Sequence, residues 1–271
     1  MKKILLSMAS VLMLLAMTAC GNDEPQDQVW YASIPMVFHV SDTENEELAN
    51  CQAGGIYAEM NVDKGTATLR GSIMMGDNEN LSFDLKDLRV RSDANHSGYI
   101  VTSPSGMNEA SGHMLSDLEF YVDMRQDGLP RHFFRAVVDR KYEVNGLLAD
   151  MGFEVTKSDV TPVVGNARTL TTGKYTFSLV TLTGENKLAG FSVRGLNVYP
   201  METGITYQGL KLEPDYEGYH IVASTEGIEP KEGGSSKLQR LEADIDVHDR
   251  SFTATFEIAG SASVTASGTM F

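Results

Sequence analysis

The chain is poor in basic residues. Its 271 residues include 22 lysines and arginines against 37 aspartates and glutamates, which gives a formal net charge of −15 at pH 7. A protein that binds nucleic acid or anionic lipid through a charged face needs the opposite balance, because it must neutralise phosphates. The composition therefore argues against a nucleic-acid partner and is typical of an acidic exported surface.

Recognisable catalytic motifs are also missing. None of the 6 histidines has the spacing of a zinc-binding helix, and the chain has no G-x-S-x-G elbow, Walker loop or glycine-rich phosphate loop between a strand and a helix. Catalytic side chains can converge from distant positions, so this absence lowers the expectation of an enzyme without removing it. We therefore expect a protein without catalysis.

Helical periodicity is scarce as well, and strand patterns dominate after residue 28. In Thr66–Ile73 the apolar residues Ala67 and Leu69 alternate with polar ones, which places one face of a strand on a core and the other in water. Turn-forming residues separate this run from similar ones. We expect short helices only near residues 46–51 and 145–151, so the chain is predicted to be all-β.

An internal repeat indicates two copies of one β unit. Residues 81–103 match residues 204–224, and residues 115–123 match residues 238–246, with an offset that stays between 120 and 123. Chance similarity between two amphipathic β segments is the alternative. The matched positions include Phe83 with Ile205, Leu88 with Leu210, Gly98 with Gly218, Tyr99 with Tyr219, Leu115 with Leu238 and Leu118 with Leu241.

A shared irregularity supports the repeat more strongly than shared alternation does. In both copies the apolar phase slips by one residue at the same place, after Leu85 and after Tyr207. Such a slip would turn the rest of the strand inside out unless an extra residue is absorbed there. We therefore predict one β-bulge at Lys86-Asp87 and another at Gln208-Gly209.

These patterns predict two tandem antiparallel β domains related by duplication, over residues 29–152 and 173–271. Each domain is expected to be a half-barrel, a barrel or a sandwich. Residues 153–172 contain a proline, a glycine and several threonines without a sustained period, so we predict a linker there. A single continuous sheet built from both halves is the alternative.

The first twenty residues have the layout of a secretory signal. Lys2 and Lys3 precede an apolar run over residues 4–16, which is shorter than the ~20 residues that span a bilayer, and small residues follow up to Cys20. The end of this segment resembles the lipobox of bacterial lipoproteins. That resemblance implies removal of a signal peptide, residues 1–19, and a diacylglycerol on the Cys20 sulfur. An ordinary signal peptide that ends near a cysteine is the alternative.

The lipobox resemblance has consequences for residues 20–28 and for the second cysteine, Cys51. Residues 20–28 then form the lipidated cysteine and an acidic spacer with the composition of a disordered segment. Asn22-Asp23-Glu24 resembles the acidic cluster that accompanies export to the cell surface in Bacteroidetes lipoproteins. With Cys20 lipidated, Cys51 has no disulfide partner, and we expect a small buried side chain rather than a reactive thiol.

The strands of the two copies carry further motifs. The progression L-x-x-L-x-V, then G-Y-I-V, then L-E-x-x-V-D resembles the calycin-like lipoprotein domains of Bacteroidetes. This resemblance implies a barrel or half-barrel, whereas the outer-membrane location is implied by the lipobox at Cys20. It transfers no functional residue, since most such domains have no assigned activity.

Asp244, Asp246 and His248 form the sharpest candidate site. On a strand they would project from one face at intervals of about 7 Å, a row that could hold a divalent cation if a neighbouring strand added oxygens. The alternative is the polar outer face of an amphipathic strand. The repeat favours that alternative, because Tyr121 and Arg125 stand at two of the matched positions. We expect no other cofactor.

Trp30 and Tyr31 open the first strand and are candidate ligand-binding residues. Flat aromatic faces stack on sugar rings, and the hydroxyl and indole N–H groups can fix the orientation of a ligand. Core filling at a strand end, which we expect for the matched tyrosines Tyr99 and Tyr219, is the alternative.

Together these observations predict a lipid-anchored binding protein of the outer membrane, without catalysis, whose ligand is a glycan, a small apolar molecule or another envelope protein. One alternative is a structural or adhesive subunit similar to lipoprotein-derived fimbrial proteins, in which the C-terminal strand over residues 262–271 exchanges between subunits. Another is a hydrolase with a dispersed site. We expect a monomer held at the membrane by the lipid on Cys20.

Overall fold

All the described strands belong to two antiparallel sheets. The computed structural model describes residues 27–45, 49–76, 79–94, 97–125, 130–181, 187–196, 204–223, 226–233 and 235–270. The first sheet contains β1 (Val29–Asp42), β2 (Ala49–Asn61), β3 (Thr66–Gly76), β4 (Glu79–Asp93), β5 (Gly98–Thr102), β6 (Met107–Ala110), β7 (His113–Asp123), β8 (Phe133–Val138) and β9 (Tyr142–Leu147). The second contains β10 (Asp150–Pro162), β11 (Arg168–Leu170), β12 (Lys174–Thr181), β13 (Lys187–Arg194), β14 (Ile205–Pro214), β15 (Gly218–Val222), β16 (Leu238–Asp246), β17 (Ser251–Ile258) and β18 (Ala262–Thr269). No helix among the described residues is long and apolar enough to cross a membrane.

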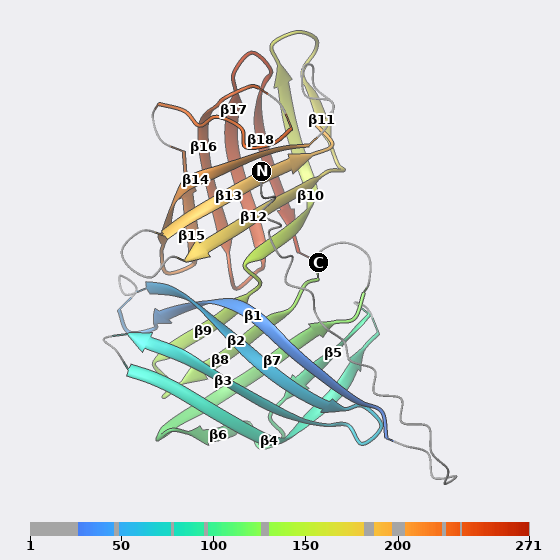
Figure 1. Cartoon of the computed structure of the whole chain (residues 1–271), viewed down its shortest axis with the longest axis vertical. Helices are drawn as coiled ribbons and strands as arrows, with labels where there is room; N and C mark the ends of the chain where they lie inside the picture. The colour runs from blue at the N-terminus through green and yellow to red at the C-terminus, as the bar shows by residue number, and fades with distance from the viewer. Residues whose placement is uncertain are drawn as a thin grey trace, which may run out of the picture.

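Each sheet closes into an eight-stranded barrel in which successive strands of the ring are neighbours. In the N-terminal barrel (β1–β9), β5 pairs with β7 and β1 pairs with β9 to close the ring. In the C-terminal barrel (β10–β18), β10 pairs with both β12 and β18. The short strands β6 and β11 each extend one strand of a ring. Figure 1 shows the two barrels one above the other. The predicted all-β tandem architecture is confirmed, and its form is the closed barrel.

Both predicted bulges are present where the sequence places them. The pairing of β3 with β4 shifts at Lys86 and Asp87, and the pairing of β13 with β14 shifts at Gly209. Asp87 has a φ of 55° and Gly209 a φ of 78°, so each bulge contains a residue in the left-handed region.

A second pair of irregularities lies in the other matched segments. The pairing of β7 with β8 shifts between Ser116 and Glu119, and that of β16 with β17 shifts between Leu238 and Arg240. The two barrels therefore share strand order, the manner of closure and the bulge at Asp87 and Gly209, and each has a further irregularity in the second matched segment. This agreement supports an origin by duplication.

Replacing Gly209 by valine is expected to destabilise the protein by about 1–2 kcal/mol, the usual cost of a left-handed backbone for a residue with a side chain. An added Cβ would meet no atom within 4 Å, so crowding contributes nothing. Gly209→Asn is the matched control, because asparagine adopts this backbone region more readily. Urea denaturation compares the two variants. Equal stabilities would mean that the left-handed conformation is not required at this bulge.

The two short predicted helices are wrong. Residues 49–51 belong to β2 and residues 145–147 to β9, while residues 46–48 lie outside the described part of the chain. Both segments pair with β1, and pairing with neighbouring strands outweighs a weak local helical pattern.

The interval 153–172, for which the sequence predicts a linker, instead holds most of β10 and all of β11. β10 is a closing strand of the C-terminal barrel and starts at Asp150, three residues after β9 ends at Leu147. A register shift between Val155 and Lys157 moves the buried positions out of phase, so that Val155 and Val160 are both buried. Because of this bulge, apolar and polar residues do not alternate regularly along β10, and the strand cannot be recognised from the sequence.

Candidate functional site

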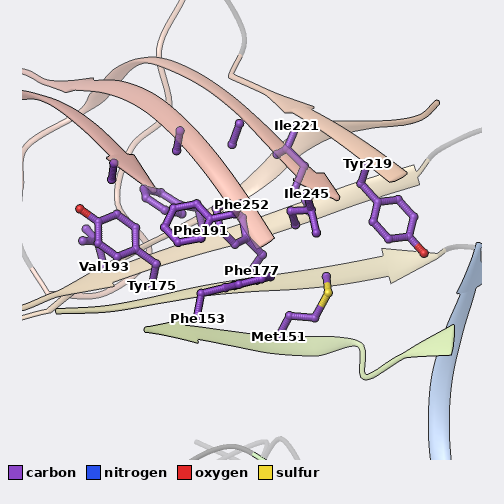
Figure 2. Close-up of a cluster of buried hydrophobic side chains, with 14 of the residues drawn as sticks. Met151, Phe153, Tyr175, Phe177, Phe191, Val193, Tyr219, Ile221, Ile245 and Phe252 are labelled. Atoms are coloured by element: carbon purple, nitrogen blue, oxygen red, sulfur yellow. The ribbon is translucent and has the colours of Figure 1, made fainter. Parts of the chain in front are cut away.

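The barrel interiors are filled by large side chains. In the C-terminal barrel the rings of Phe177 and Phe191 lie 5.2 Å apart, and those of Phe153 and Phe252 lie 5.1 Å apart. Figure 2 shows these rings packed together between the strands. Phe38, Phe120 and Phe134 are fully buried in the core of the N-terminal barrel. A ligand-binding site is therefore expected outside these clusters of rings.

One outer wall of the N-terminal barrel is buried although it faces away from that barrel's interior. Neighbouring residues on a strand project to opposite faces, so Phe38 points inward and His39 points outward, yet His39 is 0% exposed. Its partner across the β1–β9 ladder, Asn145, is 4% exposed. The turns after β14 and β16 of the C-terminal barrel cover this wall. We call the contact the inter-barrel seam. One side consists of His39, Phe133, Arg135, Glu143 and Asn145, together with Ser41, which is buried on the same face of β1 as His39. The other side consists of Asp215, Tyr219, Val247, His248 and Arg250.

His39 joins the two barrels. Its Nε2 donates a hydrogen bond to the main-chain oxygen of Asp215 at 2.6 Å, and its ring meets the Tyr219 ring edge-on with the centroids 5.5 Å apart. Because a carbonyl oxygen can only accept, Nε2 carries the proton and Nδ1 is an acceptor. Burial lowers the pKa of His39, and the bond to Asp215 opposes only part of this effect. The ring is therefore neutral at neutral pH.

A group of charges crosses the seam beside His39. Glu143 Oε1 accepts hydrogen bonds from Arg135 Nη2 at 2.8 Å and from His248 Nδ1 at 3.2 Å. Arg250 places its guanidinium over the Phe133 ring, 4.1 Å from the ring centroid. These contacts attach the turn after β16 to strands β8 and β9.

Several buried polar atoms of the seam have no hydrogen-bond partner among the described residues. A buried polar group without a partner costs about 1–3 kcal/mol and is rare in native proteins. A cluster of such atoms at one interface indicates that water or a bound polar molecule completes it. The atoms are His39 Nδ1, Ser41 Oγ, Asn145 Nδ2, Tyr219 Oη and His248 Nε2.

A cavity of about 80 Å³ lies in the seam, and we call it the seam cavity. Two of the residues with unpartnered atoms, Asn145 and His248, line it. The remaining lining combines charged and apolar side chains from both barrels. The full lining is Glu119, Phe133, Phe134, Arg135, Asn145, Leu147, Val247, His248 and Arg250.

A second pocket, of about 210 Å³, lies on the C-terminal barrel and is lined by the carboxylates of Asp215, Glu217, Asp244 and Asp246. Asp215 and Asp246 accept hydrogen bonds from main-chain N–H groups of their own turns. Asp244 is 2.6 Å from His220 Nδ1. Three of the four acids thus have structural partners already. We call this the acidic pocket.

The predicted cation row is not assembled as a metal site. Asp244 and Asp246 lie on β16, but this strand ends at Asp246, and His248 lies in the following turn with Glu143 as its partner. In the part of the chain that the structure describes, no group of three or more His, Cys, Asp or Glu side chains could hold a metal ion. The period of two that would align the row ends where the turn begins.

The other predicted residues lie apart from the seam cavity. Trp30 and Tyr31 are neighbours on β1 and therefore project to opposite faces. Trp30 packs against the core of the N-terminal barrel and Tyr31 is 49% exposed, so they do not form one stacking surface. Cys51 is buried, as expected, and stands opposite His39 in the β1–β2 ladder. Cys20 lies outside the described residues.

The sequence reasoning missed His39, Glu143 and Asn145. One signal was available in residues 34–41, which read IPMVFHVS and lack the regular polar alternation of a half-exposed strand. A nearly continuous apolar run indicates a strand that is buried on both faces. Asn145 and Glu143 carried no comparable signal, because they become buried only through pairing with that strand.

Comparison of the chain with protein families, with curated proteins and with solved structures found no match. No seam residue therefore takes a role from a relative. The features that bear on function are the geometry, burial and charges of the seam and of the acidic pocket.

Proposed function

We propose that the protein is a lipid-anchored binding protein of the bacterial cell envelope, which holds a polar ligand between its two barrels and does no chemistry on it. The observation that carries the binding role is the set of buried polar atoms in the seam that have no partner among the described residues, two of which, on Asn145 and His248, belong to the lining of the seam cavity. The aromatic filling of the barrels disfavours a small apolar ligand held in a barrel interior. The anchor rests on the sequence of residues 1–28.

A hydrolase is the second candidate, because the acidic pocket gathers four carboxylates and paired carboxylates can perform acid–base hydrolysis. We rank it below binding, because Asp215 and Asp246 accept hydrogen bonds within their own turns and Asp244 pairs with His220. Among the described contacts, this leaves Glu217 as the one acid of the four without such a structural role. Hydrolysis of glycosides or esters by the purified chain, lost in Glu217→Gln, would reverse this order.

An assembly subunit is disfavoured by the position of the C-terminal strand. β18 is paired on both edges, with β17 on one side and with β10 on the other. Exchange of this strand between subunits would therefore break two ladders and open the C-terminal barrel. Light scattering distinguishes the two functions: we expect a monomer at all concentrations, whereas concentration-dependent growth would favour assembly.

Replacing Cys20 by alanine is expected to abolish lipid attachment, because the signal region contains no other cysteine thiol on which the thioether could form. The test expresses both proteins in a bacterium that processes lipoproteins and feeds the cells an alkyne-labelled fatty acid. The original chain should take up label and sediment with membranes, and the variant should do neither.

Cys51→Ala is the matched control for this experiment. Its thiol is buried in the folded chain, so labelling and membrane association should be unchanged. A Cys20→Ala chain that still carries label, or that still sediments after a salt wash, would contradict the anchor.

A further inference from the structure

We propose that the seam cavity binds a small oxyanion, such as the carboxylate group of a ligand, between Arg135, Asn145 and Arg250. This inference rests on the proposed binding function and names the chemistry that the site recognises.

Hydrogen-bond donors dominate the lining. Arg135 and Arg250 bring guanidinium groups, and the amide nitrogen of Asn145 is a buried donor without a partner among the described residues. An oxyanion supplies acceptors to all of these groups and needs no donor in return.

The surroundings of the cavity are far less acidic than the chain as a whole. The lining contains two arginines and one acid, Glu119, and a second acid, Glu143, pairs with Arg135, whereas the whole chain has a net charge of −15. Arg135 and Arg250 line the same small cavity. Burial lowers the pKa of Arg250, attraction from Glu119 opposes this, and repulsion from Arg135 adds to it. An anion placed between the two arginines would reduce their repulsion.

The dimensions limit what can enter. A volume of about 80 Å³ is far below the ~300 Å³ at which pockets for whole organic ligands begin. The cavity therefore suits the charged group of a ligand, with Phe133, Leu147 and Val247 beside its apolar part. Because the His248 side chain is 25% exposed, the cavity reaches the edge of the seam, where the rest of a larger ligand can extend into solvent.

The test measures melting of the full chain in detergent while sodium acetate or sodium phosphate is titrated at constant ionic strength. Acetamide, which has the shape of acetate without its charge, and sodium chloride are the controls. An oxyanion that binds only the folded chain should raise the melting temperature in a saturable way. The stronger of acetate and phosphate identifies the class of oxyanion. No shift, or an equal shift with acetamide or chloride, would overturn the proposal.

Variants locate the binding. Arg250→Met and Asn145→Asp should each weaken acetate binding by about tenfold or more, as removal of a buried charge-assisted bond does. Arg70→Met is the matched control, because Arg70 pairs with Asp84 on the solvent-exposed surface of the N-terminal barrel. If Asn145→Asp does not fold, Arg250→Met alone decides. Unchanged affinity in Arg250→Met would contradict the site. Lipid labelling is independent of these measurements, so failure of either experiment leaves the other interpretable.

Discussion

Replacing Asp123 by alanine is expected to lower the free energy of unfolding by about 3–5 kcal/mol. Its side chain is 0% exposed and faces the Arg125 guanidinium, with the shortest contact at 2.6 Å. The carboxylate also accepts the main-chain N–H groups of Arg125 and Arg131, each at 3.0 Å. These bonds connect the end of β7 to the approach to β8. Alanine removes the acceptor of all of them at once, in a place that water reaches poorly.

Asp139→Ala is the matched control. Asp139 likewise accepts one main-chain N–H, from Met114 at 2.8 Å, and one side-chain contact, from His113 at 2.7 Å. Its side chain is 40% exposed, however, so water replaces the lost partner. Urea denaturation of both variants should give a clearly larger loss for Asp123→Ala. Equal losses would mean that burial of the Asp123 network adds nothing to stability.

The sequence predicted the local features of the fold because they depend on neighbouring residues. Alternation in Thr66–Ile73 depends only on which face of one strand is buried, and Ala67 and Leu69 are buried as expected. The bulges at Asp87 and Gly209 could be located for the same reason, since a slip in phase is visible within one strand.

Closure of the barrels could not be predicted in this way. It depends on β1 meeting β9 and on β10 meeting β18, contacts between residues about 100 positions apart. β10 itself was missed because the shift between Val155 and Lys157 interrupts its period. A strand whose alternation is broken looks like a linker until its partners are known.

The candidate site was beyond sequence reasoning for a further reason. His39 and Asn145 are outward-facing residues of one barrel, and only the docking of the other barrel makes them buried. The prediction that Asp244, Asp246 and His248 form a row on one strand face holds for the two aspartates, which both lie on β16. It does not hold for His248, which lies beyond the end of the strand and is oriented by its hydrogen bond to Glu143 on the N-terminal barrel.

Acid is expected to destabilise the protein between pH 6.5 and pH 4 through His132. This side chain is buried, and its Nδ1 accepts the main-chain N–H of Asp123 at 2.9 Å. Burial lowers the pKa of His132 to about 4, and the Asp123 carboxylate opposes only part of this effect. The unfolded chain, with a histidine pKa of about 6.5, therefore binds the proton first. Stability present above pH 6.5 is lost as the pH falls toward 4, by about 3 kcal/mol.

His132→Asn is the variant that isolates this loss, because an amide oxygen can accept the same N–H and does not titrate. Urea midpoints at neutral pH and near pH 4 should show that the variant retains most of the stability that the original chain loses.

Two other buried groups could contribute to acid sensitivity. Burial raises the pKa of Asp123, but hydrogen bonds from Arg125 outweigh burial and lower this pKa, so the Asp123 carboxylate weakens the fold only below about pH 4. His39, whose pKa is also lowered, remains in both chains. Full acid sensitivity in His132→Asn would therefore move the assignment from His132 to His39 and the inter-barrel seam.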